Sequence, residues 1–228
     1  MWYNERQWRI TASRFGEICR ITSRRNVKKL CETIVKPKHI NTPAISHGKM
    51  YEKKALAKFE EREQLKCNKC GLFVLPTIKF LGATPDAVIN AECIVEVKCP
   101  YGGKNEKIIP GEHFKFLCFE RNGNVALKKS SSYYDQIQGQ LFLSERNFCY
   151  FVVYTFVDLF VQIIEVDKDY CLGSLVPKLA ILPTDIRILF TNYDIIAYFL
   201  NLASCSEHFI SIQHRILATF DINKNNQF

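Results

Sequence analysis

An aspartate, a glutamate and a lysine have the types and the spacing of a metal-dependent site for phosphodiester chemistry. Asp86 is followed ten residues later by Glu96, and Lys98 comes two residues after that. Antiparallel pairing about a turn at Ala91 predicts that Asp86 faces Glu96, and strand alternation puts Lys98 on the same face as Glu96. Two facing carboxylates repel each other unless a cation lies between them. The pattern therefore indicates a Mg²⁺ site, at which an activated water attacks phosphorus while Lys98 orients or deprotonates that water.

The same three charges would also fit a surface hairpin whose polar side chains are solvated. Other residues must therefore distinguish a metal site from such a hairpin. Glu52 precedes apolar residues by three, four and seven positions, which places it on the inward stripe of a helix. An unpaired carboxylate is costly there, so Glu52 fits a metal-centred cluster or, alternatively, a buried pair with a lysine. Gln136, Gln138 and Gln140 share a later helix, where an amide would bind phosphate, water or a base edge.

A mixed α/β domain, with helices flanking a central sheet, must position these side chains. Periodicity predicts helices over 44–64 and 132–144, and Ser13 is placed to cap a short helix through Cys19. Apolar runs between turn signals predict strands over residues 72–75, 80–89, 93–97, 114–120, 125–128, 148–156 and 159–166. The chain from residue 167 onward is rich in Ile, Leu, Phe and Tyr, and we expect it to be mainly helical.

Composition narrows the class of protein. The 228 residues are 47% hydrophobic, which excludes a disordered or collagen-like chain. With 31 Lys and Arg against 23 Asp and Glu, the net charge of +8 favours a phosphate-bearing partner, although it also fits ordinary solubility. Most of the ten cysteines stand singly in apolar segments, which indicates a reducing compartment. With no secretory signal and no apolar run of membrane length, we expect a soluble intracellular protein without a membrane partner.

Cys67 and Cys70 have the spacing of one half of a zinc site. Structural zinc needs four ligands, and no second pair with this spacing occurs in the chain. We therefore expect no structural zinc.

Five motifs follow one another in a recognisable order. They are Arg6-Gln7-Trp8-Arg9-Ile10-Thr11-Ala12-Ser13, His47-Gly48-Lys49-Met50-Tyr51-Glu52, Thr84-Pro85-Asp86, Val95-Glu96-Val97-Lys98-Cys99-Pro100 and Tyr134-Asp135-Gln136-Ile137-Gln138. Over residues 5–166 the chain thereby resembles the phage lambda exonuclease/YqaJ-type recombinase family of the PD-(D/E)xK nuclease superfamily. The resemblance implies a single PD-(D/E)xK, restriction-endonuclease-like domain over 1–166, with a mainly helical extension over 167–228 packed on it. One departure is Ala87, where the family usually has glycine after the aspartate.

The resemblance also implies a role for each residue of these motifs. Asp86, Glu96 and the backbone carbonyl of Val97 would bind Mg²⁺ or Mn²⁺, and Glu52 would hold a second metal directly or through water. Lys98 would activate the nucleophilic water, and Gln136 would help to position it. Arg6 and Ser13 match positions that hold the terminal 5′-phosphate, while Arg9 and Gln138 are expected to contact DNA.

The implied function is that of a metal-dependent exonuclease that digests double-stranded DNA from a free 5′ end. The resemblance further implies a ring-shaped homotrimer and a single-strand-annealing partner. Two alternatives remain, because the Asp-Glu-Lys set does not encode dependence on an end. One is an endonuclease of the same superfamily, and the other is a DNA-binding module without catalysis.

Overall fold

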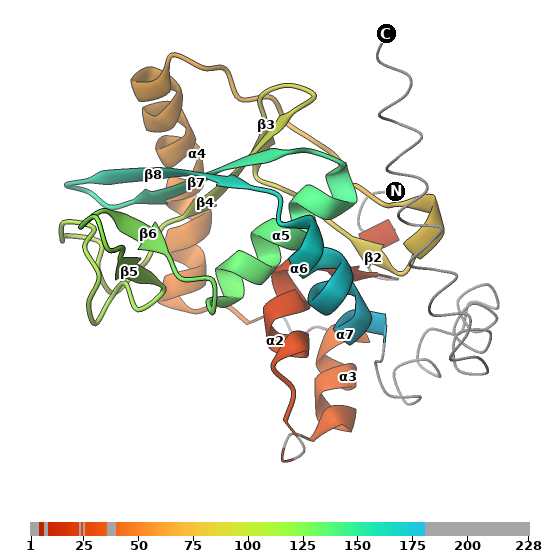
Figure 1. Ribbon diagram of the computed structural model, residues 1–228. Helices are drawn as coiled ribbons and strands as arrows, with labels where there is room; N and C mark the ends of the chain where they lie inside the picture. Colours follow the sequence, from red (N-terminus) through yellow and green to blue (C-terminus); the bar gives the residue numbers. More distant parts are fainter. Residues whose placement is uncertain (1–4, 7–8, 23, 25, 36–39, 181–228) are drawn as a thin grey trace, which may run out of the picture.

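A four-stranded mixed sheet forms the centre of the computed structural model, which describes residues 5–6, 9–22, 24, 26–35 and 40–180 (Figure 1). The strand order is β3 (Ala87–Val88), β4 (Cys93–Lys98), β7 (Phe148–Tyr154) and β8 (Leu159–Glu165). β4 and β7 are parallel, whereas β3 with β4 and β7 with β8 are antiparallel. The parallel pair requires a long connection between its strands, and this connection contains a helix that carries part of the candidate site.

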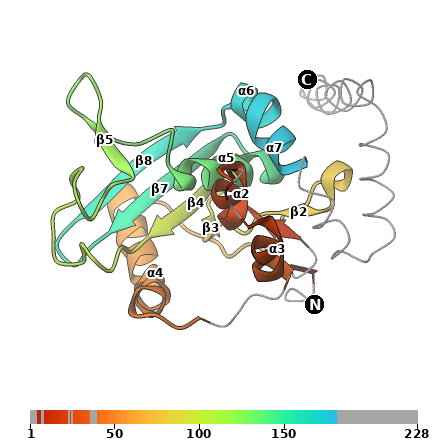
Figure 2. The same cartoon turned by 90° about the horizontal axis from the view of Figure 1, so that it is seen from below.

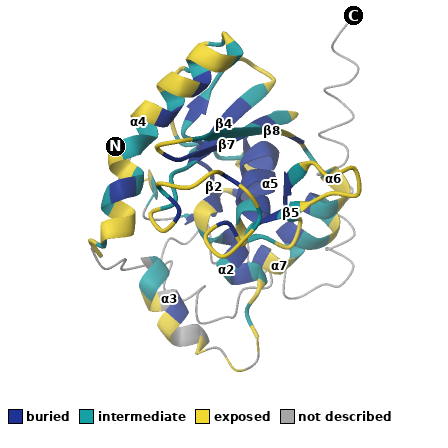
Figure 3. Ribbon diagram, turned by 90° about the vertical axis from the view of Figure 1, so that its left-hand side faces the viewer, coloured by how far each residue is buried: buried dark blue, intermediate teal, exposed yellow. Residues whose placement is uncertain are grey.

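Two helices pack against opposite faces of this sheet. α4 (Pro43–Glu63) places Phe59 in one hydrophobic cluster with Val95, and α5 (Ser132–Ser144) places Ile137 in another with Ile94. Because neighbouring residues of a strand point to opposite faces, the sheet lies between the two helices. Figure 3 shows that α5 is buried over nearly its whole length, whereas α4 is exposed along one side.

Caps fix where both helices begin and end. The Thr42 hydroxyl accepts a hydrogen bond from the Ile45 amide at 3.2 Å, and the Ser131 hydroxyl accepts one from the Tyr133 amide, also at 3.2 Å. At the other ends, Gln64 and Glu145 adopt left-handed conformations with φ of 55° and 53°. The two helices therefore agree with the prediction to within one residue at each end.

The N-terminal segment packs on the outer side of α5 (Figure 2). β1 (Ile10–Thr11) pairs in parallel with β2 (Leu81–Gly82), and the chain continues through η1 (Ala12–Arg14) into α2 (Phe15–Cys19). The ring of Phe15 lies directly against Gly139 of α5, where a Cβ atom would overlap it. Gly139 thus permits the close approach that brings the N-terminal segment to the sheet.

The other described elements complete the domain. They are α3 (Val27–Val35), η2 (Pro76–Ile78), β5 (Leu117–Phe119), β6 (Val125–Leu127), α6 (Lys168–Tyr170), η3 (Cys171–Leu175) and α7 (Val176–Ala180). β5 and β6 form an antiparallel hairpin. Leu175 and Leu179 are buried in the same hydrophobic cluster as Phe15, so this segment packs against the N-terminal segment. The predicted helical structure beyond residue 180 lies outside the described residues. None of the helices in the described ranges is long and apolar enough to cross a membrane.

The predicted fold class is confirmed, and so is the register of the hairpin, in which Ala87 pairs with Val95 and Val88 with Ile94. Two predicted strands are wrong. Residues 72–75 contribute a single bridge, between Phe73 and Ala83, and the predicted strand over 80–89 is divided into β2 and β3. Pro85 lies in that interruption and has no amide proton to donate to a neighbouring strand.

Candidate active site

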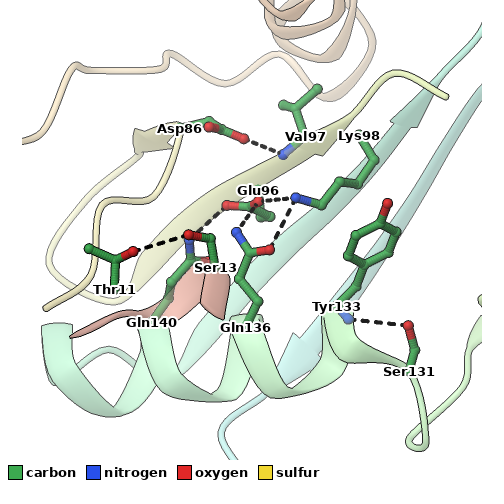
Figure 4. A network of polar contacts seen from close by, with 10 residues as sticks. All are labelled: Thr11, Ser13, Asp86, Glu96, Val97, Lys98, Ser131, Tyr133, Gln136 and Gln140. Atoms are coloured by element: carbon green, nitrogen blue, oxygen red, sulfur yellow. Dashed lines mark hydrogen bonds and ion pairs between the residues drawn. The ribbon is translucent and has the colours of Figure 1, made fainter. Parts of the chain in front are cut away.

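The residues predicted to do chemistry meet where β3, β4 and α5 come together (Figure 4). Glu96 and Lys98 are two residues apart on β4, so strand alternation directs both side chains to the same face, toward α5. Gln136 and Gln140 are four residues apart on α5, so one side of that helix presents both amides to Glu96. Asp86 immediately precedes β3, and its amide donates a 3.1 Å hydrogen bond to the Val95 carbonyl on β4.

Glu96 is the centre of a hydrogen-bond network. Its side chain is 2% exposed. Its Oε1 accepts hydrogen bonds from Lys98 Nζ and Gln136 Nε2, each at 2.5 Å, and its Oε2 accepts one from Gln140 Nε2 at 2.7 Å. A buried carboxylate is costly unless it is paired and hydrogen-bonded, and here one ammonium and two amides meet that requirement.

The two other carboxylates of the site are less well compensated. Asp86 Oδ2 accepts a hydrogen bond from the Val97 amide at 2.7 Å, yet burial and repulsion from Glu96 raise the pKa of Asp86 well above its usual value. Burial and repulsion from Glu96 also raise the pKa of Glu52, and these effects exceed the opposing ones of Lys98 and Lys53. A site that raises the pKa of two carboxylic acids is one where a cation would be bound favourably.

Lys98 carries the positive charge nearest to these acids. Burial lowers its pKa, but attraction to Glu96 and the hydrogen bond to that carboxylate outweigh burial, so the net pKa of Lys98 is raised. Its Nζ also donates a 3.2 Å hydrogen bond to Gln136 Oε1 and lies 4.7 Å from the centre of the Tyr133 ring. Lys98 is therefore held as an ammonium between the carboxylate, the amide and the aromatic ring.

The donor set fits a Mg²⁺ ion. Within the described ranges, no group of three His, Cys, Asp or Glu side chains is placed to hold a metal ion by itself. Mg²⁺ needs only one or two carboxylates, because water and substrate phosphate supply its other ligands. Thr84 Oγ1 and Gln140 Oε1 are buried without a hydrogen-bond partner in the described part of the chain, and both residues line the cavity beside Asp86 and Glu96. These oxygens are suited to accept hydrogen bonds from such waters.

One cavity of about 560 Å³ brings together most of the predicted site residues. Its lining includes Arg6, Ser13, Glu52, Asp86, Glu96, Val97, Lys98 and Gln136. Lys53 and Lys69 also line it, so the cavity combines the carboxylates with several cationic groups. Such an arrangement would accept a polyanion whose phosphate reaches the acids.

Two predictions for individual residues are corrected by the structure. Gln138 is fully buried, and its amide donates to the Glu165 carbonyl and accepts from the Asp167 amide, so it is not exposed to DNA. The Arg9 guanidinium bonds to the carboxylate and the carbonyl of Glu5 outside the cavity lining, and its contact with DNA stays a prediction. Ser13 does not cap a helix: it lies within η1, and its hydroxyl is 3.1 Å from that of Thr11.

Two residues of the site were missed in the sequence. Gln140 binds the buried carboxylate of Glu96, and Tyr133 lies beside Lys98. The four-residue spacing of Gln136 and Gln140 was the available signal for the first, because residues at this spacing share one side of a helix. For Tyr133 no comparable signal exists, since a tyrosine at helical spacing is usually part of the core.

Comparisons with known proteins identify the family and the fold. A family model described as a YqaJ-like viral recombinase domain matches residues 1–147. An alkaline exonuclease from Laribacter hongkongensis has a similar structure, with a TM-score of 0.59 and 21% identity over 89% of this chain and 95% of that one. The same exonuclease in complex with dAMP gives a TM-score of 0.59 and 23% identity over 88% and 94% of the two chains.

A phage-related exonuclease from Haemophilus somnus is a more distant neighbour, with a TM-score of 0.51 and 14% identity over 86% of this chain and 95% of that one. A search of curated proteins finds no significant match. At these identities the structural neighbours establish the fold, which is PD-(D/E)xK-like as expected.

Proposed function

The chain belongs to the family of YqaJ-like viral recombinase domains, and on this basis we propose that it is a metal-dependent exonuclease that hydrolyses double-stranded DNA from 5′ ends. The observation that carries the proposal is the meeting of Asp86, Glu96, Lys98 and Glu52 in one cavity that also contains cationic side chains. A protein that only binds DNA gains nothing from carboxylates directed at the phosphate, because they repel it.

The proposal assigns the acids and Lys98 to the cleavage step. Asp86, Glu96 and the Val97 carbonyl would hold one Mg²⁺ or Mn²⁺ ion, and Glu52 lies where it would support a second. When bound, the metal supplies an activated water and offsets the charge that develops on the scissile phosphate. Lys98, as an ammonium, would orient the nucleophile or neutralise charge at the phosphate, and Gln136 would fix the position of that ammonium through its 3.2 Å hydrogen bond.

The proposed 5′ direction is supported by a second group of residues in the cavity. Arg6 and Ser13 line the same cavity as the acids, and Lys53 and Lys69 add positive charge to it. A guanidinium binds a phosphate through two parallel hydrogen bonds, so Arg6 is suited to a terminal phosphate. With that phosphate held there, the next phosphate of the strand would lie near Asp86 and Lys98.

The test compares linear duplex DNA with covalently closed circular DNA, each incubated with Mg²⁺ or with EDTA. We expect loss of the linear form alone, in Mg²⁺ alone, with label released first from the 5′ end. Opening of the circle would indicate an endonuclease instead. Binding without cleavage of either form, in Mg²⁺ and in Mn²⁺, would indicate a DNA-binding module. Asp86→Ala is the matched control, since it should bind linear DNA without cleaving it.

A further inference from the structure

A second cavity, of about 380 Å³, adjoins the first at the catalytic residues. The two cavities share Glu52, Val97 and Lys98 in their linings. Arg6, Ser13, Asp86 and Gln136 line only the first, whereas Tyr101 and Tyr133 line only the second. The residues that would act on the scissile phosphate therefore lie at the boundary between two spaces with different linings.

The two spaces differ in chemistry. The first has an arginine and two further lysines, which suit a phosphate group. The second has no cation in its lining except the shared Lys98, and two tyrosine rings take the place of the arginine. Aromatic rings beside a phosphate-binding centre suit a nucleobase, because every base has a face that stacks on a ring.

Tyr101 is a ring held in place but not buried. It is 43% exposed, and it makes an edge contact with the ring of His47, with 5.6 Å between centroids and 74° between planes. His47 is itself buried, and its ring centroid lies 4.5 Å from that of Tyr51. The ring that Tyr101 contacts is therefore held in place by packing. Lys104 Nζ lies over the Tyr101 ring, 4.1 Å from its centre, and this cation–π contact also holds the ring in place. A ring whose position is fixed before binding loses little entropy when a base stacks on it.

We propose that this second cavity holds the nucleotide on the 3′ side of the scissile phosphate, with Tyr101 stacked on its base. The inference rests on the proposed function, because it takes the cleaved phosphate to lie at Asp86, Glu96 and Lys98. If the terminal phosphate occupies the Arg6 side, the first nucleotide fills the cationic cavity. The strand then continues past Lys98 into the space lined by Tyr101. Lys104 is placed to meet the phosphate that follows this nucleotide.

The experiment measures the coupling between the ring and the base. Initial rates are compared on duplexes that carry either a normal base or an abasic residue at the second nucleotide from the 5′ end. We expect the abasic residue to slow the wild type by roughly tenfold, the scale of one lost base–aromatic stack. Tyr101→Leu should be slower on the normal duplex by a similar factor and should respond little to the abasic residue. The abasic residue also weakens base pairing, but this affects the wild type and the variant alike. Dividing the rate ratio of the wild type by that of the variant therefore isolates the contact between the ring and the base.

Two further variants define the controls. Tyr101→Phe keeps the ring and should retain most of the wild-type response to the abasic residue. Phe119→Leu removes a ring on β5 that is 61% exposed and lies outside both cavity linings. This variant should respond to the abasic residue as the wild type does. Tyr101→Met also lacks a ring but is unbranched and flexible, and it replaces the leucine variant if that variant does not fold. Equal wild-type rates on both duplexes, or equal sensitivity in the ringless variant, would overturn the inference. Failure of the proposed function is a separate outcome, namely no cleavage of any linear duplex by the wild type in Mg²⁺ or Mn²⁺.

Discussion

The side-chain amide of Gln140 donates a 2.7 Å hydrogen bond to Oε2 of Glu96, the oxygen that neither Lys98 nor Gln136 contacts. Gln140 is 1% exposed, and its own Oε1 has no partner within the described chain. Because a carboxylate oxygen and an amide oxygen repel each other, Glu96 keeps the NH₂ group of Gln140 turned toward it. Oε1 of Gln140 therefore points away and is free to accept a hydrogen bond. Gln140 thus holds the second oxygen of a predicted metal ligand in place.

Gln140→Leu is expected to weaken metal binding. A group that orients a metal ligand typically contributes about ten- to a hundredfold in metal affinity, so the Mn²⁺ dissociation constant should rise by about that factor. Isothermal titration calorimetry measures it directly, without DNA or turnover. Gln138→Leu, on the same helix but bonded to Glu165 and Asp167, should lower the melting temperature without this change in affinity. Equal Mn²⁺ affinity in wild type and Gln140→Leu would exclude the positioning role.

Asp86→Asn should abolish cleavage yet stabilise the metal-free protein at neutral pH. Because burial and repulsion from Glu96 raise its pKa, Asp86 binds a proton more readily in the folded state than in the unfolded chain. Stability from this group is therefore present below its ordinary pKa of about 4 and is lost as pH rises toward the raised value. In EDTA, the variant should melt above the wild type at pH 7.5, and the gap should narrow toward pH 4.5. A gap that stays constant over this range would contradict the assignment.

Arg6→Ala should erase a preference for 5′-phosphorylated ends. Charge-assisted contacts of about 1.5–3 kcal/mol correspond to a preference of roughly tenfold or more in the wild type. Initial rates on otherwise identical duplexes with a 5′-phosphate or a 5′-hydroxyl measure it. Arg62→Ala is the matched control: its guanidinium donates a 2.7 Å hydrogen bond to the Leu159 carbonyl, and Arg62 does not line the cavity. Equal wild-type rates on both ends would remove Arg6 and Ser13 from the proposal.

Gly139→Ala should destabilise the domain, because the new methyl group would overlap the Phe15 ring and push α2 away from α5. Overpacking of this kind typically costs about 1–3 kcal/mol, and urea unfolding followed by circular dichroism measures it. Gly173→Ala adds the same methyl group where a Cβ meets no atom within 4 Å, so its stability should change little. Comparable unfolding midpoints for the two variants would show that α2 does not depend on this contact.

The sequence alone was sufficient to predict the hairpin register and the two long helices of the candidate site, although not the interruption before Asp86. The turn at residues 90–92 fixes the pairing of Ala87 with Val95, so Asp86 falls beside the strand that carries Glu96 and Lys98. The first residues of the two long helices could be predicted equally well. Thr42 and Ser131 cap these helices through hydrogen bonds to amides no more than three residues away in sequence. Interactions over such short separations depend little on the rest of the fold, which is why the spacing of residue types was enough to predict them.

Only the tertiary structure decided which polar residues of the other segments belong to the site. Four-residue spacing puts Gln136 and Gln140 on one side of α5, but this helix is buried between the sheet and the N-terminal segment, so its periodicity could not show which side faces Glu96. The packing of α5 on the sheet places the amide of Gln140 against the Glu96 carboxylate and that of Gln138 against the Glu165 carbonyl. Likewise, Tyr101 and Tyr133 lie 32 residues apart in sequence and line one cavity beside Lys98, because the parallel connection returns α5 to the end of β4. Contacts across such separations arise from packing of the whole domain, and no local pattern records them.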